Sequence, residues 1–151
     1  MTQAAPTATS AEEIYQAVIM DRARRPRHQR RLEAATVEAE ARNLLCGDRV
    51  SVQLDIGAEG TITALGYQAR ACAICIAATD LMAEILPGMD AMAVNQATTG
   101  FEDALRSGRT IPAGSPIAAM TPFAPLHGTP SRISCALLGW TAVTTALAGQ
   151  R

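Results

Sequence analysis

Four thiols are the side chains of this chain best suited to chemistry, because thiolates bind soft metal ions and act as sulfur nucleophiles. They belong to Cys46, Cys72, Cys75 and Cys135. The chain has only two histidines, so a histidine-rich metal site is not expected. All 13 basic residues are arginine, and the absence of lysine excludes Schiff-base and lysine-nucleophile chemistry.

Three of these thiols are predicted to lie at the ends of secondary-structure elements. Cys46 falls in a tight turn before a strand, Cys72 between a strand and a helix, and Cys135 in about the first turn of the last helix. Free N–H groups at a helix amino terminus favour thiolate over thiol, and Asp48 adds a carboxylate two residues after Cys46. Zinc accepts such sulfur and oxygen ligands, and thiolates also bind iron–sulfur clusters. The residues alone leave two interpretations open, a shared metal or sulfur site and a set of inert buried thiols.

Cys72 and Cys75 form a lone CxxC motif. Without a second CxxC, the motif does not predict a zinc ribbon. A small dithiol redox protein is one alternative, although a thioredoxin-like fold requires the motif in a parallel sheet. On a helix that begins near Cys72, the residue three positions later lies on the same face as Cys72. Cys75 is therefore either an additional ligand or a small buried side chain beside the site.

The elements that position these thiols include three predicted strands. Apolar and polar side chains alternate in all of them, as in strands with one buried face. The strands cover residues 36–43, 50–56 and 61–68. Short connections between consecutive strands predict an antiparallel meander.

Helical spacing of apolar residues appears on both sides of the strands. A capping box at Ser10 and Glu13 predicts a helix over 11–24, which Pro26 ends. The later helices are predicted from Cys72 to Pro87 and over 90–96, 99–106 and 131–147, with an irregular loop over 111–130. Three consecutive strands followed by a run of helices predict an α+β fold, in which helices pack on one face of a three-stranded antiparallel sheet.

The composition predicts one globular domain over residues 11–151, preceded by a disordered tail over 1–10. Of the 151 residues, 48% are apolar and 18% are charged, a balance too apolar for a disordered protein. The net charge of −1 argues against a nucleic-acid-binding protein. No apolar run is long enough for a membrane span, and residues 1–10 lack the pattern of a secretory signal. We therefore expect a cytoplasmic protein with no membrane partner.

Four stretches of the sequence resemble the U-type iron–sulfur cluster assembly proteins, the family of IscU, SufU and the NifU amino-terminal domain. The stretches are Tyr15–Asp21 with the following Arg25-Pro26-Arg27, then Cys46-Gly47-Asp48-Arg49, Cys72–Ala78 and Arg132–Trp140. The resemblance spans about residues 11–148. The long interval between Cys72 and Cys135 resembles the SufU branch, as does Ser134 where the IscU branch carries a histidine.

The resemblance implies a SufE/NifU-like fold and a metal site. The implied ligands are Cys46, Asp48, Cys72 and Cys135, holding zinc or a transient [2Fe–2S] cluster, with Cys135 as the acceptor of persulfide sulfur. A cysteine desulfurase and apo iron–sulfur client proteins are the implied partners, and nucleic acid is not. In that interpretation the arginine-rich segment 22–31 docks on an acidic patch of the desulfurase.

These observations predict an iron–sulfur cluster assembly protein, either a scaffold or a zinc-dependent sulfur acceptor, rather than a stand-alone enzyme. Two alternatives belong to other classes. One is a small CxxC thiol redox protein that uses Cys72 and Cys75 as a reversible dithiol. The other is a zinc-stabilised interaction module without sulfur transfer.

Overall fold

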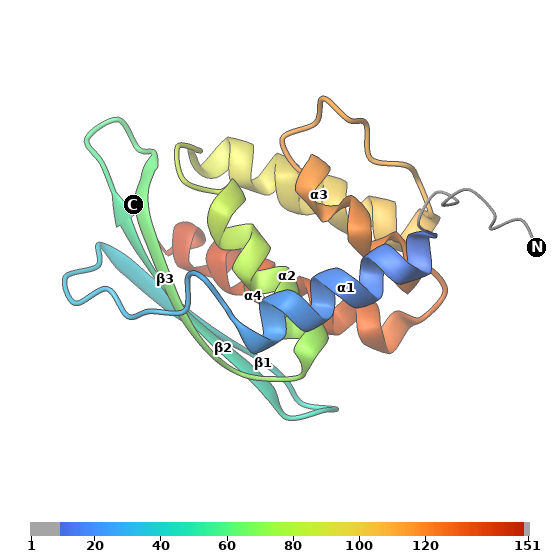
Figure 1. Ribbon diagram of the computed structural model, residues 1–151. Helices are drawn as coiled ribbons and strands as arrows, with labels where there is room; N and C mark the ends of the chain where they lie inside the picture. The colour runs from blue at the N-terminus through green and yellow to red at the C-terminus, as the bar shows by residue number, and fades with distance from the viewer. Residues whose placement is uncertain (1–9, 150–151) are drawn as a thin grey trace, which may run out of the picture.

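A computed structural model describes residues 10–149. Three antiparallel strands form one sheet in chain order, and the helices pack on one of its faces (Figure 1). The strands are β1 (Val37–Asn43), β2 (Asp48–Ile56) and β3 (Ile62–Arg70). The predicted α+β fold with three antiparallel strands is therefore confirmed. The predicted disordered tail lies outside the described residues, except for Ser10.

Alternate side chains along each strand face the helices. Along β2, Val50, Val52 and Leu54 are fully buried, as expected for the inward positions of an alternating strand. The first hairpin pairs Val37 with Leu54 at its open end and Asn43 with Asp48 beside the turn. β2 begins two residues earlier than predicted, so Asp48 is part of the strand and is held by its pairing.

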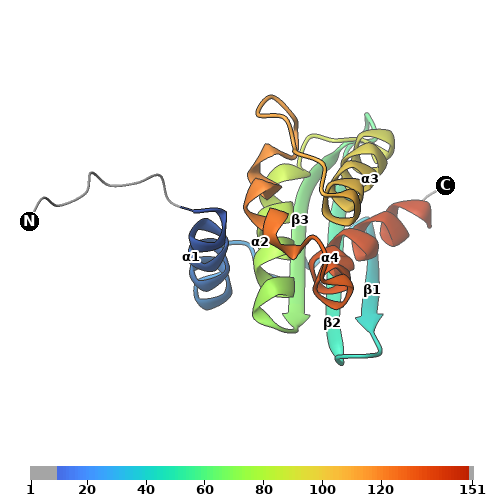
Figure 2. The same ribbon diagram turned by 90° about the vertical axis from the view of Figure 1, so that its right-hand side faces the viewer.

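Two central helices lie between the sheet and the outer helices. These are α2 (Ala73–Ile85) and α4 (Pro130–Ala148), and α1 (Ala11–Arg24) packs on α2 away from the strands (Figure 2). The predicted bounds of α1 are confirmed, because the Ser10 hydroxyl accepts from the Glu13 amide and the Glu13 carboxylate accepts from the Ser10 amide. One buried cluster includes side chains from every helix and strand described.

The two short helices predicted over 90–96 and 99–106 are wrong, because a single helix, α3 (Ala91–Ser107), covers both ranges. Asp90 caps its start, and Gly108 ends it at a left-handed φ of 73°. Gly100 lies inside this helix, where an added Cβ would meet Ile117 at an ordinary contact distance of 3.4 Å, and the buried residues of α3 continue on both sides of it. Packing therefore outweighs the weak helix propensity of glycine.

The irregular loop predicted over 111–130 is also corrected, because it contains the 3₁₀ helix η1 (Ala118–Leu126). Its buried side chains are Met120, Phe123 and Leu126, which are spaced by three residues. This spacing matches the three residues per turn of a 3₁₀ helix and places all three side chains on one face. The prolines of the segment disguised that period in the sequence.

The opposite face of the sheet is partly covered by the chain that follows α1. The Arg30 carbonyl oxygen would lie 2.6 Å from a Cβ at position 66, so only Gly66 allows this crossing. Beside it, the Gln53 and Gln68 amides bond to each other, while Leu32 N–H donates to Gln53 and Gln68 donates to Arg30. These bonds satisfy the buried amide of Gln53.

No helix within residues 10–149 combines the length and apolar character needed to cross a bilayer.

Candidate metal and sulfur site

Three donor groups from distant parts of the chain meet at one end of the sheet. The Sγ atoms of Cys46 and Cys135 and a carboxylate oxygen of Asp48 all lie within 4.8 Å of one another. The two sulfur atoms are 3.9 Å apart. Cys46 lies in the β1–β2 turn, Asp48 is the first residue of β2, and Cys135 lies in α4. The structure thus brings together three of the four ligands that the sequence predicted.

The β1–β2 turn presents Cys46 at the surface. Asn43 holds the turn with its side-chain oxygen, which accepts from Leu45 N–H, and with its carbonyl oxygen, which accepts from Gly47 N–H. Gly47 has a φ of 74°, a left-handed conformation that glycine adopts without strain. The side chains of Leu44 and Leu45 face solvent, with 90% and 95% of their surface exposed.

Asp48 is the one acidic side chain buried at this site, with 5% of its surface exposed. Its Oδ1 accepts a hydrogen bond of 3.1 Å from the Cys72 backbone N–H. Its Oδ2 is buried and has no hydrogen-bond partner within the described residues. A buried carboxylate oxygen without a partner is costly, and a cation beside it would remove that cost. The donor set of two thiols and one carboxylate suits zinc.

Cys72 lies next to this group as the N-cap residue of α2. It is exposed and is not among the three donors that lie within 4.8 Å of one another. Partial burial of its sulfur raises the pKa of the thiol, and the Asp48 carboxylate raises it further. Cys72 therefore adjoins the three donors through its backbone bond to Asp48, but its sulfur is not among the atoms that the structure groups together.

Cys135 lies in the second turn of α4, slightly deeper than predicted, and only 8% of its surface is exposed. Burial raises the pKa of its thiol well above the usual range, and charge on Cys72 and Cys46 adds to the shift. The helix-terminus effect expected from the sequence applies to Cys72, the N-cap residue of α2, and not to Cys135, which lies further inside α4. The second turn lies beyond the free N–H groups, and desolvation dominates.

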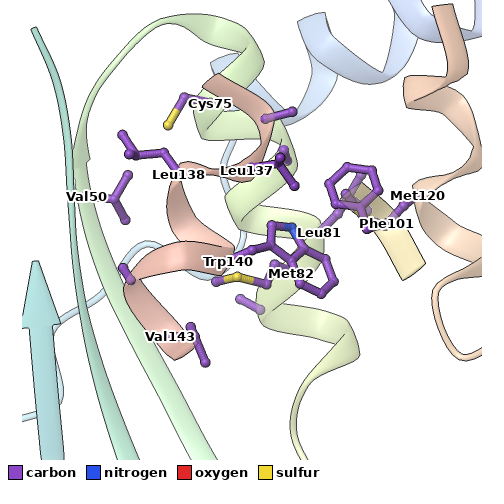
Figure 3. Packing of buried hydrophobic residues seen from close by; sticks show 14 of the residues in the cluster. Val50, Cys75, Leu81, Met82, Phe101, Met120, Leu137, Leu138, Trp140 and Val143 are labelled. Atoms are coloured by element: carbon purple, nitrogen blue, oxygen red, sulfur yellow. The ribbon is translucent and has the colours of Figure 1, made fainter. Parts of the chain in front are cut away.

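Cys75 faces the interior and is fully buried. Figure 3 shows its sulfur directed towards the side of the core where Val50 and Leu138 lie. Burial raises the pKa of this thiol to about 12, with a further contribution from the Asp48 carboxylate. These surroundings favour a small core side chain over an additional ligand. They also weaken the dithiol redox alternative, which needs a reactive thiolate at Cys75.

A buried ion cluster around Asp80 was missed from the sequence. Asp80 is fully buried on α2, and its carboxylate accepts from the backbone N–H groups of Arg27 and His28, the Arg22 guanidinium and the Tyr67 hydroxyl. Burial alone would raise the pKa of Asp80, but these donors outweigh it and hold the pKa below the usual range. The available signal was an acidic residue inside the apolar run of α2.

The Asp80 cluster also changes the interpretation of the arginine-rich segment 22–31. Arg22 pairs with Asp80 and Glu84, and Arg27 pairs with Asp21. Much of the positive charge predicted to dock on a desulfurase is therefore used within the fold.

Residues 14–105 match the family model described as the NifU-like N terminal domain. This range contains Cys46, Asp48, Cys72 and Cys75 and covers more than half of the chain. The chain belongs to the NifU-like N-terminal domain family. The predicted family is thus confirmed.

Curated relatives of this NifU-like domain align over nearly their whole length. The iron-sulfur cluster assembly scaffold protein IscU of Thermotoga maritima is 26% identical over 89% of the chain and 92% of the relative. The zinc-dependent sulfurtransferase SufU of Bacillus subtilis is 24% identical over 89% of the chain and 90% of the relative. Both alignments are longer than the family match.

Solved structures share the same fold. A NifU-like protein (N-terminal) from Brucella abortus superposes with a TM-score of 0.82 at 24% identity, covering 94% of this chain and 100% of that one. A protein described as an iron-sulfur cluster assembly scaffold for the SUF system, from Fervidobacterium islandicum AW-1, has a TM-score of 0.80 at 25% identity, covering 91% and 99%. The NifU-like fold therefore extends over nearly all of the chain.

Proposed function

We propose that this NifU-like domain is an iron–sulfur cluster assembly protein that accepts persulfide sulfur at Cys135 and holds a zinc ion through Cys46, Asp48, Cys72 and Cys135. The observation that carries the proposal is the group of donors that spans 4.8 Å, together with the buried Oδ2 of its member Asp48, which has no hydrogen-bond partner between residues 10 and 149. The relatives named as a scaffold and as a zinc-dependent sulfurtransferase support it.

Each donor residue has its own task. When bound, zinc supplies the positive charge that favours thiolates over thiols. The Cys72 amide fixes the Asp48 carboxylate through Oδ1, and Oδ2 has no hydrogen-bond partner between residues 10 and 149, so it is free to bind the ion. Cys46 sits on an exposed turn, and its departure from the donor set would open access to Cys135 without disturbing the core.

The sulfur transfer itself needs only thiol exchange. The Cys135 thiolate attacks the outer sulfur of a cysteine persulfide on the donor protein, a new S–S bond forms on Cys135, and the donor cysteine leaves as a thiolate. No oxidant is consumed, because the persulfide already carries sulfur at the required oxidation level. A cysteine desulfurase supplies such a persulfide, and apo iron–sulfur proteins are the final recipients.

Ser134 favours sulfur acceptance over stable cluster scaffolding. Its hydroxyl donates to the Pro130 carbonyl oxygen within α4 at 3.2 Å, so it is engaged in the helix and adds no ligand. The branch of the family with a histidine at this position has a further nitrogen donor beside its last cysteine. In this chain the proposed ligands are three thiols and one carboxylate, and these four donors are sufficient for tetrahedral zinc.

The decisive variant is Cys135→Ser, with Cys75→Ser as its matched control. After incubation with a cysteine desulfurase and cysteine, the wild-type chain and Cys75→Ser should gain the mass of one sulfur atom, measured by intact mass spectrometry without reductant. Cys135→Ser should gain none while keeping its far-ultraviolet circular dichroism spectrum. Full sulfur loading of Cys135→Ser would reject the proposed acceptor. A zinc-stabilised interaction module would bind zinc and gain no sulfur in any form.

A further inference from the structure

Three arginines stand side by side across the whole sheet. Arg42 of β1 pairs with Arg49 of β2, and Arg49 pairs with Arg70 of β3. Directly paired residues on antiparallel strands point to the same face. The neighbouring inward positions Val50 and Ala41 are buried, so the three arginines, which we term the arginine row, lie on the face opposite the helices.

Little acidic charge within the fold balances the arginine row. Arg42 pairs with Glu40 on its own strand at 2.7 Å. Neither Arg49 nor Arg70 forms an ion pair with any residue between 10 and 149. Like charges directly opposite each other destabilise a sheet, and adjacent strands are only about 4.8 Å apart. The arginine row therefore presents more positive charge than the single neighbouring carboxylate of Glu40 balances, and an acidic ligand outside the chain would neutralise the excess.

The arginine row borders the candidate site. An open cavity of about 340 Å³ lies between them, and it is lined by Arg42, Asn43, Leu44, Gly47, Asp48, Arg49 and Arg70. The β1–β2 turn forms one wall of this cavity and carries two leucines that are almost completely exposed. Positive charge and apolar surface thus meet around the β1–β2 turn, at the end of the sheet that also carries Cys46 and Asp48.

An acidic protein segment fits this surface better than a nucleic acid does. On the same face, Glu40 and Glu38 lie directly behind the arginine row, opposite Ser51 and Gln53. They limit the positive strip to the width of one row, whereas a nucleic-acid backbone needs an extended positive track. The exposed side chains of Leu44 and Leu45 can also enter an apolar pocket, which a protein partner provides.

We propose that the arginine row binds an acidic segment of the protein that donates sulfur, while Leu44 and Leu45 enter an apolar pocket of the same protein. This inference rests on the proposed function and specifies how its partner docks. The contact would bring the sulfur donor to the end of the sheet where the β1–β2 turn carries Cys46. Electrostatic complementarity of this kind speeds association and selects the partner.

The test compares two variants that change net charge equally. Arg49→Gln/Arg70→Gln neutralises the arginine row, and Arg24→Glu alters an exposed arginine at the end of α1, away from the thiols. Binding of each to the organism's own cysteine desulfurases is measured by calorimetry at low and physiological salt, with metal content and sulfur loading determined in parallel. A hexaglutamate peptide serves as a competitor, and a single-stranded RNA oligonucleotide as the nucleic-acid probe.

We expect Arg49→Gln/Arg70→Gln to bind a desulfurase about tenfold more weakly at low salt, with a smaller difference at physiological salt. Arg24→Glu should bind like the wild type, and hexaglutamate should compete with the desulfurase. Leu44→Ser/Leu45→Ser should weaken binding at both salt concentrations, because apolar contacts are not screened. All variants should keep the wild-type metal content.

Equal binding by Arg49→Gln/Arg70→Gln and the wild type would overturn the inference. It would also be overturned if Arg24→Glu lost as much affinity as Arg49→Gln/Arg70→Gln, because the loss would then depend on net charge and not on the arginine row. Binding of the RNA that depends on the arginine row would identify a nucleic-acid surface instead. If the wild type accepts sulfur normally in these experiments, only the docking inference fails. If the wild type neither binds a desulfurase nor accepts sulfur, the proposed function fails and the docking inference fails with it.

Discussion

Asp48 divides its two carboxylate oxygens between the fold and the candidate metal site. Oδ1 accepts from the Cys72 amide at the start of α2, and Oδ2, which has no partner in the described part of the chain, is the oxygen that we propose binds the metal. A carboxylate is a harder ligand than the thiolates around it. It is therefore the donor whose loss changes the lifetime of a bound metal most selectively.

Asp48→Ala should still bind zinc, through the remaining thiols, but release it at least about tenfold faster, as measured by transfer to a chromogenic chelator. Cys75→Ala is the matched control, because it alters a buried neighbour that is outside the donor group. Its zinc release should match the wild type. Identical release from Asp48→Ala and the wild type would show that Asp48 only caps the turn.

The thiols of the candidate site were predictable from the sequence, whereas the arginine row was not. Cys46, Cys72 and Cys135 lie beside turn residues and at changes of hydrophobic period, which are local signals. Arg42 and Arg49 meet only through the hairpin register, which Asn43 and Asp48 fix beside the turn. Pairing the residues at equal distances from that turn would have placed Arg42 opposite Arg49. The position of Arg70 depends in addition on the register of the hairpin between β2 and β3.

At the scale of elements, α4 and α2 approach closely where Gly139 meets Thr79. A Cβ at position 139 would lie 2.8 Å from Thr79 Cγ2 and closer still to its hydroxyl. Gly139 is four residues after Cys135, so both residues lie on the same face of α4. The close contact between these helices therefore also positions the proposed sulfur acceptor.

Gly139→Ala should destabilise the fold by about 1–3 kcal/mol, because the added methyl group overpacks the contact between the helices. Adding Thr79→Ala should restore most of that loss, since it removes the atoms that clash. Urea denaturation of the four proteins of this double-mutant cycle measures the coupling. Strictly additive effects would mean that the two helices adjust independently of this contact.

The Asp80 cluster joins α1, α2, β3 and the turn after α1 through one carboxylate. Asp80→Asn should cost about 3 kcal/mol, because it leaves Arg22 without its buried partner, while Tyr67→Phe should cost only about 1 kcal/mol. The folded-state pKa of Asp80 is lowered. Its contribution is thus complete above the unfolded value of about 3.9 and is lost as the pH falls through the folded pKa.

Acid titrations of stability can separate that contribution from the rest. The wild type should lose stability below about pH 4 more steeply than Asp80→Asn, because the variant has no proton to take up at this position. The measurement is the free energy of unfolding in urea between neutral and acidic pH. Parallel curves for the two proteins would assign the acid sensitivity to other carboxylates.

The elements with clear end signals were predictable, and those shaped by tertiary packing were not. The capping box gave the bounds of α1, and alternation gave the three strands within two residues. The prediction divided α3 in two at residues 97–98, although its buried side chains continue across that point from Val94 to Leu105. The 3₁₀ helix η1 was missed because a period of three, interrupted by Pro122 and Pro125, is not a pattern of ordinary helices.

At the scale of the whole molecule, the four proposed ligands come from four segments. Cys46, Asp48, Cys72 and Cys135 belong to the β1–β2 turn, β2, the start of α2 and α4. A ligand that binds only the folded state adds stability in proportion to the logarithm of its concentration. Metal occupancy and global unfolding are therefore expected to be coupled.

Removing bound zinc with a chelator should lower Tm by roughly 5–10 °C, if the metal was present at about one hundred times its Kd. Cys46→Ser should show a smaller shift, because one of its thiolate ligands is lost. Differential scanning calorimetry with and without chelator provides the comparison. A wild-type Tm that does not respond to the chelator would separate metal binding from the stability of the fold.

The open edge of the sheet has a consequence for colloidal behaviour. β3 is flanked by the bridges that Gln29 and Arg30 form with Tyr67, whereas the outer side of β1 pairs with no strand in the described part of the chain. A free strand edge is a template on which another copy can add and begin a fibril. In β1, Glu38, Glu40 and Arg42 alternate with the inward residues, and such charges act as gatekeepers against edge-to-edge growth. Replacing them with apolar residues would turn this edge into the nucleus of an aggregate.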